Sequence, residues 1–308
     1  MGDNLRLGYW AVGIGLVLAM TLFVSDPYVA SIVNIVAIAA LIAVSLRFVL
    51  LIGELNFATA AFVGIGAYTT GTVITILEWP FAVALILGGV VASLISIVFG
   101  YITLRTKGPY FLLIGFAFTE AVRIVYSKSM VLGGNSGMVG IFPPIALDAW
   151  MPTFVMAVAA LLIFVLFLIE RSDFGRILTA IRDNEDVART VGLNILFAKI
   201  ACFALASFAA GVAGSLHAVV NNVISPGDFS FLLAAFALAY VKVGGEDNII
   251  GPIVGSVLLV ALGSYALGLG GHEHIFYGAA IVIAVLLMPQ GITGLVRKGR
   301  DRLMARSN

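Results

Sequence analysis

Long apolar segments follow one another along almost the whole chain and constrain its fold more than any other feature. About ten of them approach the roughly 20 residues that a helix needs to cross a bilayer. They cover residues 9–25, 28–52, 56–77, 81–104, 109–127, 151–170, 198–221, 229–244, 249–270 and 275–290. Only 11% of the 308 residues are charged, whereas a soluble domain carries about one quarter. The sequence therefore predicts an all-α, polytopic transmembrane helix bundle that forms a single domain over residues 1–308 and is surrounded by membrane lipid.

The basic residues predict how the chain is oriented in the membrane. Lys and Arg gather in short loops on the cytoplasmic side. We count residues 9–25 as a span and not as a cleaved signal peptide, because no small-x-small cleavage site precedes Ser25. With ten spans and a cytoplasmic N-terminus, fifteen of the 17 Lys and Arg residues lie inside, and only Arg123 and Lys128 lie toward the outside. We expect an N-in/C-in topology, with an outer loop at about 128–150 and a charged inner loop at about 171–198.

The inner loop carries the signals of a short helix. Asp183 is a residue type favoured at the N-cap, so we expect a helix over residues 184–191. Glu185 and Asp186 follow in the first turn, where the helix dipole stabilises negative charge. Arg189 lies toward the far end, where positive charge is favoured.

The same short helix has an apolar edge and needs a partner. Gly192 suits the left-handed conformation that often ends a helix. Val187 and Val191, four residues apart, form the apolar edge. A helix this short is not stable alone, so it docks either on a cytoplasmic ATPase or on lipid headgroups and its own bundle. Its acidic residues and its lack of an aromatic side chain favour a protein partner.

Two stretches are alike although they open spans that run in opposite directions. GELNFATAAFVGIGAYTTG opens span three at 53–71, and SPGDFSFLLAAFALAYVKVGG opens span eight at 225–245. Each has an acidic residue close to a Phe, then small residues, then Tyr and Gly. Inverted repeats place interrupted helices along a path at the middle of the membrane. We therefore expect inverted halves and a substrate path lined by Asn56, Phe57, Tyr68, Phe229 and Phe231.

Several function classes lack their sequence signals. No GxxxxGK[ST] motif occurs, so this chain is not expected to bind ATP through a Walker loop. No hydrolase or metalloprotease pattern is found, so we expect no enzyme activity. The single cysteine, Cys202, excludes an internal disulfide and a Cys-based metal site. A net charge of +1 gives no sign of a nucleic-acid partner. We expect neither metal nor cofactor in this chain.

Stretches in a fixed order, from about residue 28 to 294, also resemble a known family. They are LNFATAAFVGIGAYTTG at 55–71, RTKGPYFLLIGFAFTEAVRIV at 105–125, GGNSGMVGI at 133–141 and FGRILTAIRDNEDVARTVGLN at 174–194, followed by SPGDFSF at 225–231 and MPQGITGL at 288–295. In this combination the chain resembles the LivM-type permeases of bacterial branched-chain amino acid ABC importers.

The resemblance implies a transmembrane permease that moves branched-chain or related amino acids, or similar small polar solutes, inward by alternating access. It implies two cytoplasmic ABC ATPase subunits that bind ATP and Mg, a LivH-type permease as heterodimer partner, and a periplasmic substrate-binding protein. The location would be the bacterial inner (plasma) membrane. The resemblance makes the inner-loop helix an ATPase-coupling helix, whose residues are Arg182, Asp183, Glu185, Asp186, Val187, Arg189 and Gly192. It also implies binding-protein contacts at Gly133, Gly134, Asn135 and Gly137.

The sequence departs from the family pattern at two places, and alternatives stay open. Asn135 and Ser136 follow the paired glycines, where the family often has Pro, and Glu246, Asp247 and Asn248 follow the glycines after span eight. Urea, amides, organic acids, sugars and nucleosides therefore remain alternative substrates. A stand-alone secondary transporter driven by an ion gradient would also explain the inverted halves. It would not explain the capped, charged inner helix, and it would need buried ion ligands that the sequence lacks.

Overall fold

The computed structural model of the protein describes residues 26–106, 108–148, 150–267, 278, 282 and 291–294. The predicted span 9–25 lies outside the described residues, as does span 275–290 apart from residues 278 and 282. The other eight predicted spans are helices, which confirms the all-α fold over the described part of the chain.

The long and medium helices match the predicted spans within a few residues. They are α2 (Pro27–Leu50), α3 (Thr59–Thr75), α4 (Phe81–Thr103), α5 (Pro109–Lys128), α7 (Met151–Arg171), α10 (Ile195–Asn221), α11 (Phe231–Gly244) and α12 (Ile250–Leu267). Among the described residues, α2, α4, α5, α7 and α10 are long and apolar enough to cross a membrane. The count of ten spans and the N-in/C-in orientation stay predictions.

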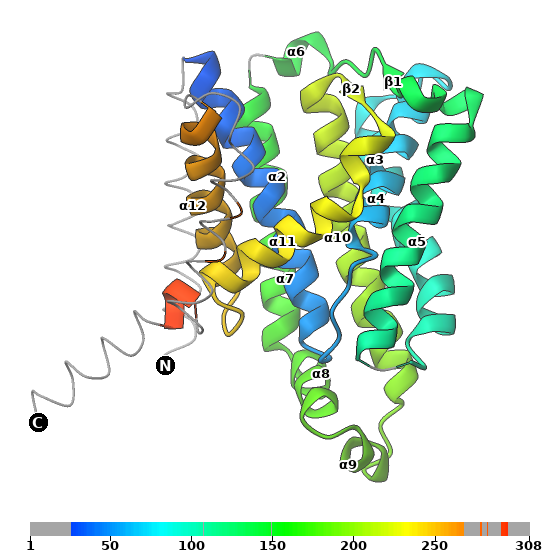
Figure 1. Ribbon diagram of the computed structural model, residues 1–308, viewed down its shortest axis with the longest axis vertical. Helices are drawn as coiled ribbons and strands as arrows, with labels where there is room; N and C mark the ends of the chain where they lie inside the picture. Colours follow the sequence, from blue (N-terminus) through cyan, green and yellow to red (C-terminus); the bar gives the residue numbers. More distant parts are fainter. Residues whose placement is uncertain are drawn as a thin grey trace, which may run out of the picture.

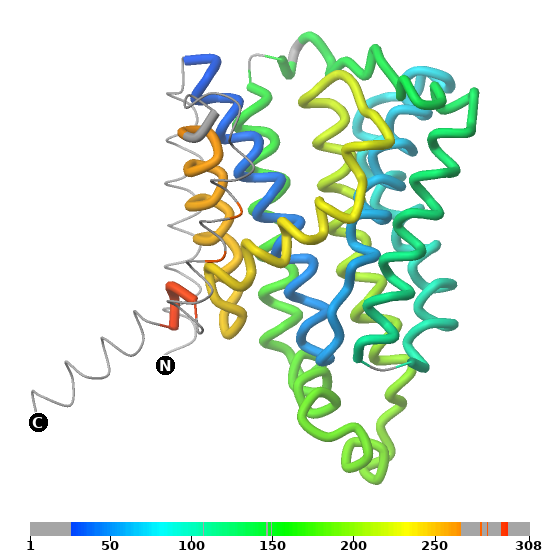
Figure 2. Tube along the Cα trace, in the orientation of Figure 1, coloured from blue at the N-terminus to red at the C-terminus, as the bar shows by residue number. Residues whose placement is uncertain are grey.

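Short elements fill the two ends of the bundle (Figure 1). One end carries η1 (Met130–Leu132), η2 (Gly134–Ser136), β1 (Met138–Val139), α6 (Ile145–Asp148) and β2 (Val223–Ile224). After β2, η3 (Pro226–Phe229) lies within the bundle, where Phe229 contacts Tyr68 of α3. The opposite end carries α8 (Asp173–Asp183) and α9 (Glu185–Thr190). Figure 2 shows the chain through α8 and α9 extending beyond the ends of the long helices. The predicted outer and inner loops therefore lie at opposite ends of the molecule.

Helix α10 lies at the centre, where small residues let its neighbours come close. It packs against α2, α3 and α4. A Cβ atom added to Gly66 of α3 would lie 2.0 Å from the carbonyl oxygen of Gly211 in α10. One added to Gly214 would lie 1.9 Å from the carbonyl oxygen of Val63. Membrane helices associate through close backbone contacts of this kind, because the hydrophobic effect does not drive helices together within lipid.

The helices around α10 present large apolar side chains to the outside of the bundle. Val98 and Ile102 of α4, Leu113 of α5 and Leu161 of α7 are all exposed. Side chains of this kind are compatible with a surrounding of lipid and not with water. The outward faces of α4, α5 and α7 therefore fit the hydrocarbon of a membrane.

Helices α3 and α11 share an unusual construction. Each is short, with 17 and 14 residues, and each follows a segment without α-helix, residues 53–58 or 222–230. In Figure 1 the first segment rises from the α8–α9 end into the bundle, the second descends from the opposite end, and α11 crosses the bundle obliquely. Two interrupted helices entered from opposite ends are the arrangement that inverted repeats produce. The sequence placed these helix starts too early, at residues 56 and 229, because the apolar residues of both segments are compatible with a helix.

A buried ion pair joins α2 and α7. Arg47 of α2 is 2% exposed, and its guanidinium lies 2.7 and 2.8 Å from the two carboxylate oxygens of Glu170 in α7. Its Nε also donates to the carbonyl oxygen of Glu246, after α11, at 2.8 Å. One side chain thus holds α2, α7 and the turn before α12 together.

Candidate docking helix and translocation path

The charged inner loop contains two helices where the sequence predicted one. Phe174, Ile177, Leu178 and Ile181 recur at helical spacing along α8, and its middle is buried against the bundle. This apolar stripe is the signal that the prediction missed. It carries the helix through Asp183, where α8 ends.

The prediction of Asp183 as the N-cap of the docking helix was wrong. Because Asp183 still has helical backbone, the extended conformation needed for a cap falls on Asn184, with φ −159° and ψ 103°. The Asn184 side-chain oxygen accepts hydrogen bonds from the backbone N–H groups of Asp186 and Val187, both at 3.1 Å. Helix α9 therefore begins at Glu185, one residue later than predicted.

At its other end α9 stops at Thr190, one residue earlier than predicted, and Gly192 has the predicted left-handed conformation. Gly192 has φ +84°, in the left-handed region, and its N–H donates to the carbonyl oxygen of Arg189 at 3.0 Å. Both ends of this six-residue helix are thus held by local hydrogen bonds.

Helix α9 has two faces of different character. Val187 and Val191 are 57% and 75% exposed, although both are apolar. The charged side chains of Asp183 and Arg189 are also mostly exposed around them. Ala188, the residue after Val187, is buried against the bundle. An apolar edge with a charged rim at the tip of a projection is a surface suited to binding another protein.

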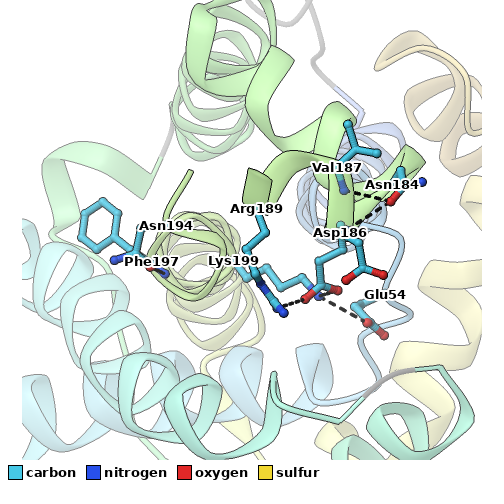
Figure 3. Close-up of polar contacts among 9 residues, drawn as sticks. Glu54, Asn184, Asp186, Val187, Arg189, Asn194, Phe197 and Lys199 are labelled. Atoms are coloured by element: carbon cyan, nitrogen blue, oxygen red, sulfur yellow. Dashed lines mark hydrogen bonds and ion pairs between the residues drawn. The ribbon is translucent and has the colours of Figure 1, made fainter. Parts of the chain in front are cut away.

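Glu185 does not belong to the exposed face. One of its carboxylate oxygens lies 3.2 Å from the ammonium group of Lys199 in α10, and the other lies 3.4 Å from Arg189. Lys199 also lies 3.9 Å from the carboxylate of Glu54. The Lys199 and Glu54 side chains are only 4% and 6% exposed. Figure 3 shows Lys199 directed toward Glu54, and Val187 on the side of α9 away from both.

The sequence predicted no role for Lys199 or Glu54. A signal was present, because an ionisable residue beside or inside an apolar span marks a functional position. Lys199 lies one turn into the apolar α10, and Glu54 stands just before α3. Nothing in the sequence indicated that the two residues meet, since they are 145 positions apart.

The segment before α3 packs closely against the docking end. A Cβ atom on Gly53, which has φ +80°, would lie 3.2 Å from Cγ of Arg182 in α8. The carboxylate of Glu54 accepts a hydrogen bond from the backbone N–H of Gly108 at 3.2 Å. Residues 53–54 are therefore held between α8, α10 and the α4–α5 turn.

Beyond this segment, the predicted path residues lie together inside the bundle. The ring of Phe57 lies 5.9 Å from that of Phe231, and this contact joins the segment before α3 to the start of α11. The ring of Tyr68 lies 5.9 Å from that of Phe229. Asn56 is buried beside Phe57, and its side-chain oxygen has no hydrogen-bond partner among the described residues.

Tyr126 of α5 belongs to the same aromatic cluster but was not predicted. Its ring stacks on that of Tyr68, with centroids 4.0 Å apart. Both phenol oxygens are buried without a hydrogen-bond partner among the described residues. Buried polar groups are normally paired, so these oxygens, like that of Asn56, suit an interior that binds a polar solute or water.

The predicted outer contact residues form a tight glycine turn. Gly133, Gly134 and Gly137 have φ of +81°, +56° and +76°. A Cβ atom on Gly133 would lie 1.8 Å from the carbonyl oxygen of Gly137, so the turn has no space for a side chain there. The turn leads into β1, which pairs with β2 in antiparallel register, and it leaves Asn135 exposed.

Comparison with known proteins identifies the family of the chain. The family described as "Branched-chain amino acid transport system / permease component" matches residues 28–287. The high-affinity branched-chain amino acid transport system permease protein LivM of Salmonella typhimurium is 28% identical over 275 residues, 80% of this chain and 65% of the relative. The chain thus spans about two thirds of the length of that relative.

Other relatives are permeases of different types. The probable branched-chain amino acid transport permease protein LivH of Methanocaldococcus jannaschii is 28% identical over 49% of this chain and 50% of its own length. The ribose import permease protein RbsC of Haemophilus influenzae is 22% identical over 86% of this chain and 85% of its own length. No solved structure matches the chain.

The family match covers most of the chain, and it includes α9, the buried charges before α3 and the aromatic cluster. Together with the apolar helices it shows a multi-pass membrane protein. The chain belongs to the branched-chain amino acid transport permease family and is of the LivM type.

Proposed function

We propose that this chain is a permease subunit of an ATP-driven importer in the bacterial inner membrane, with α9 as the helix that couples it to a cytoplasmic ATPase. One observation carries the proposal: a helix capped at both ends projects from the basic end of the bundle with Val187 and Val191 exposed. The basic residues at this end support a cytoplasmic location, because Lys and Arg gather in the cytoplasmic loops of membrane proteins.

The partners follow from the same proposal. Two ATPase subunits bind ATP and Mg and act on α9 and on the neighbouring Arg182 and Asp183. A LivH-type permease forms the other half of the membrane unit, and this chain's similarity to both LivM and LivH proteins supports such a pair. A periplasmic binding protein delivers substrate to the turn at Gly133, Gly134, Asn135 and Gly137.

The solute class is that of branched-chain or related amino acids. The names of the LivM relatives support it, and the aromatic cluster would accept an aliphatic side chain while Asn56 and the tyrosines accept polar groups. Sugars are the second candidate class, because ribose and arabinose permeases also match the chain. Uptake of labelled leucine, with unlabelled ribose, urea or short amides as competitors, distinguishes the classes.

Val187→Asp is expected to separate the ATPases from the membrane subunits. A carboxylate buried in an apolar interface costs more than about 1.4 kcal/mol, so we expect binding to weaken by at least about tenfold. The measurement is the amount of ATPase that co-purifies with the tagged chain, together with substrate uptake. The chain itself should still insert and fold, because Val187 contacts solvent in the isolated subunit.

Val139→Asp is the matched control. Val139 is 67% exposed and lies in β1, at the end of the bundle opposite α9. We expect this variant to retain its ATPases. Equal ATPase recovery with both variants would remove α9 as the docking site.

A further inference from the structure

Three charged side chains form a continuous connection between the docking helix and the segment that opens the path. Glu185 of α9 lies 3.2 Å from Lys199, and Lys199 lies 3.9 Å from Glu54. The three residues come from α9, α10 and the segment before α3, as Figure 3 shows for Lys199 and Glu54. The connection spans the boundary between the exposed tip and the interior of the bundle.

The burial of these groups makes the connection sensitive to movement. Lys199, Glu54 and Glu185 are 4%, 6% and 17% exposed. A buried charge needs its partners, because the free energy lost when it leaves water is offset only by its interactions with groups of opposite charge. Lys199 lies between the carboxylates of Glu185 and Glu54. A displacement of α9 that moved Glu185 away would take one negative charge from Lys199 and so change its electrostatic interaction with Glu54.

Glu54 in turn is part of a segment that is held by several contacts and ends in the aromatic cluster. Its carboxylate accepts the N–H of Gly108, and the preceding Gly53 packs against Arg182. Three residues after Glu54, the carbonyl oxygen of Phe57 accepts a hydrogen bond from the Thr119 hydroxyl at 3.0 Å, and the Phe57 ring contacts Phe231. A shift at Glu54 would therefore move the segment before α3 and its contact with the start of α11.

We propose that Lys199 and Glu54 are positioning residues that transmit the movement of α9 to the Phe57–Phe231 contact, so that ATP hydrolysis and solute passage stay coupled. The inference rests on the proposed function, because it assumes that an ATPase acts on α9. It assigns a role to a buried ion network that is separate from the exposed docking surface. Coupling of this kind requires two arrangements of one contiguous network.

Lys199→Met tests the proposal in the complete complex. Permeases and ATPases are reconstituted in lipid nanodiscs and proteoliposomes with the binding protein, and three quantities are measured: ATPase retention, ATP hydrolysis, and solute transported per ATP. We expect retention to stay normal and hydrolysis to continue. We expect transport per ATP to fall by about tenfold, a usual size for coupling between sites.

The controls separate charge from packing. Lys199→Arg keeps the cation and is expected to restore most of the transport per ATP. Lys242→Met removes a lysine of α11 that pairs with Glu246 four residues away, and we expect transport per ATP to be unchanged. If Lys199→Met accumulates poorly, Glu54→Gln provides the second variant, because a glutamine oxygen can still accept the N–H of Gly108.

Glu54→Gln and the double variant identify the network. If both residues act through one connection, Glu54→Gln also lowers transport per ATP, and the double variant is no worse than the poorer single variant. Normal transport per ATP in Lys199→Met and in Glu54→Gln would overturn the inference. Loss of the ATPases from the wild-type complex would instead refute the proposed function, so the two failures are distinguishable.

Discussion

A Gly66→Ala variant is expected to yield little folded protein, although it adds only one methyl group. The added Cβ atom would lie 2.0 Å from the carbonyl oxygen and 2.6 Å from the Cα atom of Gly211. Both contacts are to backbone, so no side chain can turn aside, and α3 and α10 must separate. Overpacking costs about 1–3 kcal/mol where a core can adjust, and we expect at least the upper figure here.

The separation would be especially costly in a membrane. Lipid tails solvate apolar side chains as well as protein does, so helix association depends on close packing. Folded yield and thermal midpoint, measured by size-exclusion chromatography of a fluorescent fusion, test the expectation. Gly100→Ala is the matched control, because the nearest atom to its Cβ would be the flexible end of Leu104, at 3.2 Å. Equal midpoints for the two variants would contradict the close backbone contact between α3 and α10.

Arg47→Met is the second variant with a large expected effect on stability. It removes the guanidinium that binds both oxygens of Glu170 and the carbonyl oxygen of Glu246. The Glu170 side chain is only 22% exposed, so its charge would be left largely without solvent. Removing one partner of a buried pair costs about 3–5 kcal/mol. We expect a clearly lower thermal midpoint in detergent.

Two further variants distinguish the burial of the pair from its charge. Replacing both partners, Arg47→Met with Glu170→Met, is expected to recover much of the loss, because no buried charge remains unpaired. Arg176→Met breaks a similar pair with Asp173 on the surface of α8, and we expect less than about 1 kcal/mol there. A double variant as unstable as Arg47→Met alone would contradict the explanation.

The sequence predicted the spans well because the length of each apolar run by itself indicates a helix that can cross a membrane. The end of α2, for example, was predicted at residue 52 and lies at Leu50, and α4 begins at Phe81 as predicted. The start of α3 was predicted less well, at residue 56 and not Thr59. Composition cannot distinguish a membrane helix from an apolar non-helical segment that is enclosed by other helices.

The docking helix shows the limits of local signals. Gly192 was predicted as its left-handed end because only glycine adopts that conformation without strain. The N-cap was misassigned because Asp183 and Asn184 are both good caps, and the choice depends on how far the preceding α8 extends. Tertiary packing of α8 on the bundle decided between them.

The buried charges could not have been paired from the sequence. Lys199 counts in the sequence only as one more basic residue near the cytoplasmic end of a span. Its position between Glu54 and Glu185 depends on how α10, α9 and the segment before α3 pack together. The contact of Tyr68 with Tyr126 is of the same kind, because it brings α3 and α5 together across 58 positions of sequence.

Purification of the tagged chain from its native membrane in mild detergent, with mass spectrometry of the proteins that accompany it, tests the central claim most directly. The proposed function predicts that ATPase subunits and a second permease co-purify with the wild-type chain, and that Val187→Asp loses the ATPases while it keeps the permease. A chain that purifies alone, or only with copies of itself, would contradict the importer assignment and would favour a transporter driven by an ion gradient.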